Sequence, residues 1–224
     1  MCWLKRLERG QTMSEENKLN QIIRKDAKSC FVESLRDSFE IKKIHLYFAT
    51  YDMERPVGER ITNSVHMYVD VDKFLELCRQ IKCGEFGYKL QQRKKSSDSK
   101  ALFEYWGGTS AENLRKQGRE RADGKSLSRI VKIIAGKQTD LLLIADSGPG
   151  EEDKNGLIVP RFGNKPENHV AVSMSLESLY ELLLLTEIHY MAWLTTWYMK
   201  HPLDNVKQYH EKANGNSPAM PQVF

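Results

Sequence analysis

The sequence predicts an α+β fold, in which a curved, mainly antiparallel sheet is covered by a long C-terminal helix. Short segments of alternating apolar and polar residues recur between residues 41 and 174, separated by Gly, Pro and charged turns. From residue 176 the alternation gives way to one continuous apolar stretch, with Ser175 placed to cap a helix and Pro202 to end it. We expect about eight strands, in one or two sheet units.

The length and composition suit a single core domain with extensions. The 224 residues are 40% hydrophobic, enough for one substantial core. We expect this α+β core over residues 41–201, a leader and peripheral segment over 1–40, and a polar tail over 202–224. Apolar residues in 14–40 recur at a loose helical spacing, which predicts a peripheral or partly ordered amphipathic segment of helical character. Met13 and the residues that follow it resemble the N-terminus of a protein chain, so residues 1–12 are expected to be a translated leader.

Two strands are predicted first in the core. Ile44, Leu46 and Phe48 alternate with His, Tyr and Ala, and a second alternating run covers 65–70. A turn at Pro56 separates the two runs. These segments are typical of half-buried, adjacent strands.

A short helix capped by Asp72 and ended by Gly84 should follow. Residues 85–91 and 101–106 are then predicted as strands of a hairpin whose polar tip is 92–100.

The second half of the core repeats this mixture. A short helix is expected to start at Thr109 or Ser110, with Leu114 as its apolar anchor. An acidic loop is expected over 147–153. The further strands predicted here are 127–134, 141–145, 156–160 and 169–174.

The long helix over 176–200 is predicted to be buried rather than to span a membrane. Glu177, Glu181, Glu187 and His189 interrupt its apolar residues, so no uncharged run approaches the ~20 residues that a span requires. Because more than one face is apolar, we expect it to pack on the sheet and on a second copy of the chain in a homo-oligomer. Packing on the sheet alone is the alternative.

Cysteine usage and the lack of a secretory signal favour a cytoplasmic protein with reduced thiols. The four cysteines show no paired CxxC spacing, so we expect no zinc site. The acidic residues Asp146, Glu151, Glu152 and Asp153 offer oxygen ligands for Mg²⁺ or Ca²⁺ but lack the spacing of a calcium loop. Solvated hairpin acids are the favoured interpretation, and we expect no metal or cofactor.

Positive charge is concentrated in one stretch. Residues 89–137 contain thirteen Lys or Arg and five Asp or Glu, a net charge of +8, whereas the whole chain has a formal net charge of +4. Nucleic-acid phosphate is the commonest partner of such a stretch, and a solvated surface loop is the alternative. Gly118 and Gly124 would let backbone N–H groups approach phosphates, which arginine binds bidentately. The residues expected to contact phosphates are Arg93, Lys94, Lys95, Arg115, Lys116, Arg119, Arg121, Lys125 and Arg129.

Aromatic side chains supply a second candidate surface. His45, Tyr47 and Tyr51 share one face of the first predicted strand, and His66 and Tyr68 share one face of the second. If the strands pair, this face becomes a platform on which nucleic-acid bases can stack. A face that meets only solvent or a covering helix is the alternative. The best stacking candidates are Tyr47, Tyr68, Tyr105 and Trp106.

Sequence motifs of catalysis are missing from the chain. It has no G-x-S-x-G elbow, no H-E-x-x-H, no Walker motif and no dinucleotide-binding fingerprint. We therefore expect a protein that is not an enzyme.

Two blocks of sequence resemble a family of poorly characterised proteins carried by integrative and conjugative elements of Firmicutes. They are Phe103–Ala111 with Gly118–Arg129, and Gly148–Glu152 with Gly156–Arg161. The resemblance implies a mobile genetic element as the setting. The strand-rich body closed by a long helix also looks like the whirly-type single-stranded-DNA-binding fold, which has two units of four strands and a helix. Here the first helix is predicted to follow the second strand.

These observations together favour a nucleic-acid-binding protein that is not an enzyme and prefers single-stranded DNA. It would serve replication, transfer or maintenance of the mobile element. The alternative is a protein-interaction or inhibitory factor of the element, acting through the long helix and the acidic loop.

Overall fold

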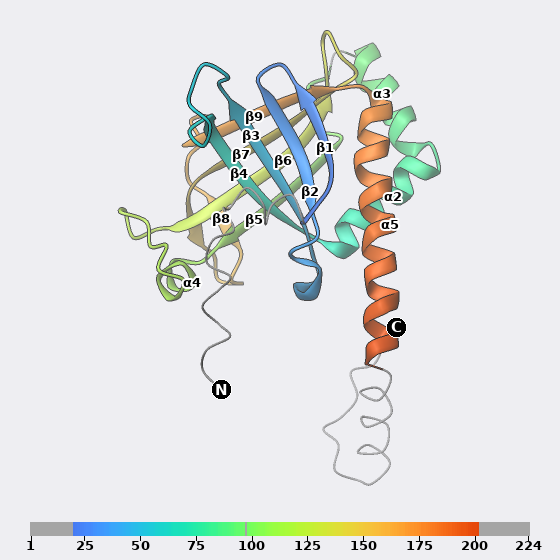
Figure 1. Cartoon of the computed structure of the whole chain (residues 1–224). Coiled ribbons are helices and arrows are strands. Elements are labelled where there is room, and N and C mark those ends of the chain that lie inside the picture. The colour runs from blue at the N-terminus through green and yellow to red at the C-terminus, as the bar shows by residue number, and fades with distance from the viewer. Residues whose placement is uncertain (1–19, 97, 202–224) are drawn as a thin grey trace.

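The computed structural model describes residues 20–96 and 98–201 and shows two antiparallel sheets with helices at their edges (Figure 1). The predicted α+β class, with two sheet units and a long C-terminal helix, is confirmed. The first sheet has the strand order β1-β2-β3-β4. Its strands are β1 (Gln21–Ala27), β2 (Cys30–Leu35), β3 (Lys43–Tyr51) and β4 (Ile61–Asp70).

The second sheet is built around one long strand, β7. β6 pairs with β7 along one side, while β9 and the short β8 pair with successive parts of its other side. β5 lies at the outer edge and pairs with β6. The strands are β5 (Phe103–Thr109), β6 (Ser126–Ala135), β7 (Leu141–Glu152), β8 (Ile158–Pro160) and β9 (Asn168–Met174).

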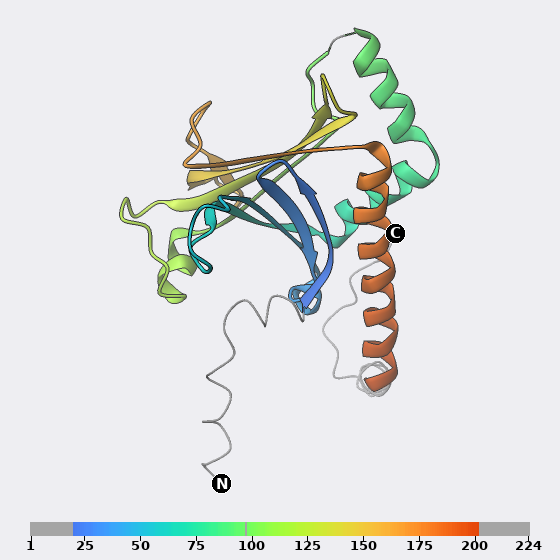
Figure 2. The same ribbon diagram turned by 45° about the horizontal axis from the view of Figure 1, so that its top comes forward.

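Helices lie at two ends of this pair of sheets. α4 is at the end opposite α3, and α5 runs along the side of β1 and extends past the sheets (Figures 1 and 2). The Ser175 hydroxyl accepts a hydrogen bond from the Ser178 backbone, as predicted for the cap of α5. The helices are η1 (Phe39–Ile41), α2 (Val71–Lys82), α3 (Glu85–Ser96), α4 (Ala111–Lys116) and α5 (Leu176–Lys200).

The hydrophobic core lies between the two sheets and under α2 and α5. Leu46 and Met67 of the first sheet, Val131 and Leu143 of the second, and Leu182 of α5 all belong to it. Strands from both sheets also bond directly, since the Cys30 thiol donates to the Ala171 carbonyl oxygen at 3.3 Å. The core thus joins the two sheets into one domain.

The helix predicted over residues 14–40 is wrong for its described part. Residues 21–35 form the hairpin β1–β2, with a left-handed Ser29 (φ 58°) in its turn. All six residues of β2 are buried, so the strand shows no alternation of buried and exposed residues by which it could be predicted. As a result the helix α2 follows the fourth strand, not the second. The predicted leader over 1–12 and tail over 202–224 lie outside the described residues.

Residues 85–96 correct a second prediction. They form α3, so the hairpin with its tip at 92–100 is wrong. Phe86 and Leu90 are the buried residues of α3 and lie one helical turn apart. Gly87 lies beneath α5, because a Cβ there would be 3.7 Å from the Tyr180 hydroxyl. The acidic loop expected over 147–153 is also wrong as far as Glu152, since β7 continues through it.

α5 is only partly covered. Leu179, Leu182 and Leu183 are buried, but several large apolar side chains nearer its C-terminus are exposed. In the residues that the structure describes, no helix is long and apolar enough to cross a membrane. The exposed side chains are Leu185, Ile188, Met191, Trp197, Tyr198 and Met199.

A substitution of Phe39 tests whether the segment before β3 belongs to the core. It is 1% exposed and packs edge-on against Tyr190 and Trp193, with ring centroids 5.2 and 5.7 Å away. We predict that Phe39→Ala lowers the free energy of unfolding by about 3–5 kcal/mol, measured by urea denaturation. Ile41, which is 66% exposed, is the matched control, and Ile41→Ala should cost less than about 1 kcal/mol. Equal, small losses would place Phe39 outside the core.

Candidate functional site

A cavity of about 450 Å³ opens where the two sheets diverge, beyond the apolar core. The first sheet and its connection from β2 to β3 contribute Asp37, Lys43 and Tyr68, while β5 contributes Tyr105 and Gly107. From β6 and the loop after α4 come the two arginines, Arg129 and Arg119. The cavity is therefore lined by the stretches that the sequence singled out for charge and for aromatic residues.

Arg129 occupies the boundary between core and cavity. Alternate residues of β6 face the other sheet, so Arg129, Val131 and Ile133 lie on the same face. Val131 and Ile133 are buried in the core, and Arg129 follows them at its edge. Arg129 is 6% exposed, and its Nη1 donates to the Thr109 hydroxyl at 3.0 Å. Burial lowers the pKa of Arg129, and the charge of Arg119 adds to this. No carboxylate pairs with Arg129 among residues 20–96 and 98–201.

Arg119 reaches the cavity through the turn that ends α4. Gly118 adopts a left-handed conformation (φ 65°), and the backbone N–H of Arg119 donates to the Leu114 carbonyl oxygen at 2.9 Å. Leu114, the predicted anchor, is 2% exposed and ties this loop to the body. No side-chain ion pair of Arg119 is present in the described part of the chain.

Two histidines of the aromatic face form a hydrogen-bonded chain beside the cavity. The carboxylate of Asp37 lies 2.9 Å from Nδ1 of His45, whose Nε2 lies 2.9 Å from Nδ1 of His66. Burial lowers the pKa of His66 to about 4, helped by the nearby His45, Arg129 and Arg119. His66 is therefore neutral at neutral pH.

The two tyrosines that line the cavity are held in different ways. Tyr68 stacks one face on His45, with ring centroids 4.4 Å apart and an interplanar angle of 21°. Tyr105 is tied down, because its hydroxyl donates to Asp70 Oδ2 at 2.6 Å. Asp70 also binds Lys43. Burial opposes ionisation of Asp70, but the hydrogen bonds from Lys43 and Tyr105 hold its pKa below the usual range.

Three predicted phosphate contacts are already paired with acids. Arg115 pairs with Glu120 at 3.2 Å and Lys116 with Glu112 at 2.6 Å, both at the surface. Arg121 binds both Asp123 and Glu167, at 2.9 and 2.7 Å. The exposed pairs of Arg115 and Lys116 are individually weak, but together with the pairs of Arg121 they cancel much of the local charge. Lys125 is exposed just before β6 and does not line the cavity.

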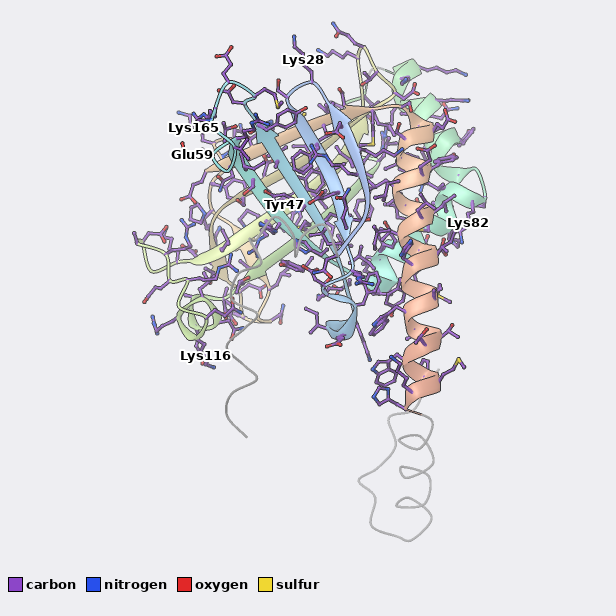
Figure 3. The ribbon with its side chains drawn as sticks, in the orientation of Figure 1. Lys28, Tyr47, Glu59, Lys82, Lys116 and Lys165 are labelled. Carbon is purple, nitrogen blue, oxygen red and sulfur yellow. The ribbon has the colours of Figure 1, made fainter. Side chains whose placement is uncertain are left out.

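The second basic arm, Arg93 to Lys95, does not join the first. It lies on α3, at the end of the molecule opposite α4 (Figures 1 and 2). Arg93 pairs with Asp98, and Lys94 pairs with Asp140 at 2.8 Å. In Figure 3, Lys116, the last residue of α4, lies well away from Lys82, the last residue of α2.

The remaining stacking candidates also separate. Tyr47 lies on the first sheet (Figure 3) and packs against His66, with ring centroids 4.5 Å apart. It is therefore next to the cavity residues without lining the cavity. Trp106 alternates with the cavity-lining Tyr105 and Gly107 and so points to the other face of its sheet, where its Nε1 donates to Glu104.

The acidic residues at the end of β7 are engaged locally. Asp146 lies 2.6 Å from His169 Nδ1, and Glu151 pairs with Arg161 at 2.8 Å. Asp153 accepts backbone hydrogen bonds from Asn155 and Leu157 in the turn that follows. Over the described ranges, no group of three or more His, Cys, Asp or Glu is arranged to hold a metal ion. Cys30, Cys78 and Cys83 are free thiols.

Sequence reasoning missed Asp37, Lys43 and Gly107 as parts of the site. Asp37 fell within the helix wrongly predicted for residues 14–40. The pairing of β2 with β3, which puts Leu35 opposite His45, brings Asp37 near that histidine. A correct strand assignment would have supplied this signal.

Comparison of the chain with protein-family models, with curated proteins and with solved structures gives no match. The site therefore has to be interpreted from its own geometry and charge.

His66 makes stability depend on pH. Its folded-state pKa is about 4, below the ordinary 6.5, so the unfolded chain binds this proton first as the pH falls. The contribution is fully present above about pH 6.5 and is lost as the pH drops towards about 4. We predict a loss of about 2 kcal/mol in unfolding free energy between pH 7 and about pH 5, measured by urea denaturation. His66→Gln should lose much of this dependence, and an unchanged pH profile in that variant would contradict the assignment.

Proposed function

We propose that this chain is a nucleic-acid-binding protein without enzymatic activity and that it prefers single-stranded DNA. One observation carries the proposal. The basic loop and the aromatic face, about 50 residues apart in sequence, meet at one cavity, where Arg119 and Arg129 have no carboxylate partner among the described residues. A positively charged cleft beside an aromatic ring is the combination that single-stranded nucleic acid requires.

The cavity offers guanidinium groups to the phosphates of a nucleic acid and an aromatic ring to its base. Guanidinium groups bind phosphate oxygens through paired hydrogen bonds, and Arg129 is held in place by Thr109. Tyr68 is half-buried, with one ring face on His45. Only an unstacked base can reach a ring inside a cavity, because duplex bases are stacked and paired. Single strands are therefore favoured over duplexes.

The biological setting rests on sequence resemblance. The segments around Tyr105 and Gly148 resemble proteins of integrative and conjugative elements, so we place the activity in replication, transfer or maintenance of a mobile genetic element in the cytoplasm. Transfer and replication of such an element both expose single-stranded DNA.

Binding should be measured by fluorescence anisotropy with a single-stranded oligonucleotide and its duplex at two salt concentrations. We predict tighter binding of the single strand and a steep loss with added salt, since phosphate contacts release counterions. Arg119→Gln should weaken binding about tenfold, as expected for the loss of a charge-assisted contact.

Two surface variants serve as matched controls. Lys95→Gln on α3 and Arg115→Gln, whose partner is Glu120, each remove one positive charge outside the cavity. Both should bind within about threefold of the wild-type protein. Absence of binding to either oligonucleotide at low salt would overturn the proposed function. Equal losses in all three variants would exclude the cavity as the site.

A homo-oligomer through α5 is the second part of the proposal. The C-terminal half of α5 extends beyond the sheets (Figure 2), and it has no charged residue between Glu187 and Lys200. Ile188, Met191 and Met199 are 60%, 49% and 76% exposed. Two such uncharged stripes from two copies are complementary under two-fold symmetry. We therefore assign a second copy of this chain as the occupant.

Size-exclusion chromatography with light scattering tests this assignment. We predict a dimer for the wild-type protein and a monomer for the double variant Ile188→Glu with Met191→Glu, since burying two carboxylates opposes association. Val57→Glu, at a position 85% exposed on the β3–β4 turn, should leave the dimer intact. A monomeric wild-type protein would contradict the assignment and favour the alternative, an interaction factor that uses α5 against another protein.

A further inference from the structure

The buried guanidinium of Arg129 demands an anion. It is 6% exposed, and Thr109 is its one hydrogen-bond partner in the described part of the chain. A cation with so little access to water and no carboxylate partner is costly, and the N–H donors that Thr109 does not engage are open to an acceptor in the cavity. Hydrophobic residues would pack the end of the core at lower cost, so the arginine indicates a ligand that enters the cavity.

The hydrogen-bond donors around the cavity match a phosphomonoester better than a phosphodiester, because two guanidinium groups can share its three terminal oxygens. Lys43 is paired with Asp70, and Asp37 is hydrogen-bonded to His45. Arg119 and Arg129 are left as two cations without carboxylate partners over the described ranges. A phosphomonoester carries about −1.5 to −2 charges at pH 7, whereas each internal phosphodiester of a strand carries about −1. Two guanidinium groups therefore favour a phosphate at the end of a strand.

The size of the cavity also favours a terminal group. About 450 Å³ lies within the usual range for a small-molecule site, and the aromatic Tyr68 shares the lining with the arginines. Gly107 and Met67 both line the cavity, and a Cβ on Gly107 would lie 3.5 Å from Met67 Cε. The absence of a side chain at residue 107 therefore leaves space beside Met67. A single nucleotide is of the size that such a space accommodates.

We infer that this cavity is a phosphomonoester site, in which Arg129 and Arg119 bind the terminal phosphate of a nucleotide whose base lies against Tyr68. The inference rests on the proposed function and deepens it, because it makes the end of a strand the preferred ligand. The same chemistry is offered by the phosphorylated end of an oligonucleotide and by a free nucleoside monophosphate.

The test compares oligonucleotides that differ only in their ends. Fluorescence anisotropy is measured with a thymidine oligonucleotide bearing a 5′-phosphate, a 3′-phosphate or hydroxyl groups at both ends. One of the two phosphorylated forms should bind at least about tenfold more tightly than the hydroxyl form. Equal affinity of all three would overturn the inference while leaving the proposed function standing. Loss of binding for all three would end both.

Two variants locate the preference. Arg129→Gln should bring the affinities for the phosphorylated and hydroxyl forms within about threefold of each other, because the phosphorylated form loses more binding than the hydroxyl form. Gly107→Ala is the second variant, because its methyl group adds no charge and makes only ordinary contact with Met67, so the fold tolerates it. It should reduce the end preference by narrowing the cavity. A preference that persists in both folded variants would overturn the inference.

Competition with thymidine monophosphate then identifies the source of the phosphate. Displacement of the phosphorylated oligonucleotide at a similar concentration would support the inference with a free nucleotide as a sufficient ligand. Displacement only at a concentration at least about a hundredfold higher would support a strand end, because the rest of the strand then contributes to the affinity.

Discussion

The packing of the two sheets through their apolar faces is the interaction on which the rest of this structure depends. Met67 of β4 and Val131 of β6 lie in that contact, and α2 and α5 cover its side. Burial of apolar area is the main stabilising contribution to such a core. The contact ends at Arg129, where the next inward side chain of β6 is charged and the sheets part to leave a cavity. The same face of one strand thus supplies both core and site.

The elements that the sequence predicts correctly have one water-facing side or a clear cap. β4 and β9 alternate between buried and partly exposed residues, and the Ser110 and Ser175 hydroxyls cap α4 and α5 as expected. β2 fails this test because it is covered on both faces, so that even its polar residues Glu33 and Ser34 are buried and no period of two marks the strand.

Tertiary contacts override local signals elsewhere. α3 contains Gly87, which weakens a helix in isolation, but the burial of Phe86 and Leu90 in the core stabilises the helix in the fold. β7 extends past Gly148 and Gly150 because β6 on one side and β8 and β9 on the other satisfy its backbone. No local pattern in the sequence encodes either outcome.

The candidate site was partly predictable from residue types. The basic stretch and the Tyr/His face are visible in the sequence, and their convergence is a property of the fold. Arg119 and Arg121 are two residues apart and chemically identical, yet Arg121 is neutralised by Asp123 and by Glu167, which is 46 residues away. Which arginine lacks an acidic partner and can bind a ligand therefore depends on contacts between distant segments. These contacts cannot be predicted from composition.

The most direct measurement is an NMR titration of the arginine side chains. Nitrogen-15 labelling of the guanidinium groups reports each arginine separately while a 5′- or 3′-phosphorylated single-stranded oligonucleotide is added. Binding in the cavity predicts that the Nε–H signals of Arg119 and Arg129 shift together and saturate at one ligand concentration, with Arg93 unchanged. Shifts confined to Arg93, Arg115 and other exposed arginines, with Arg129 unmoved at saturation, would contradict the assignment of the cavity as the nucleic-acid site.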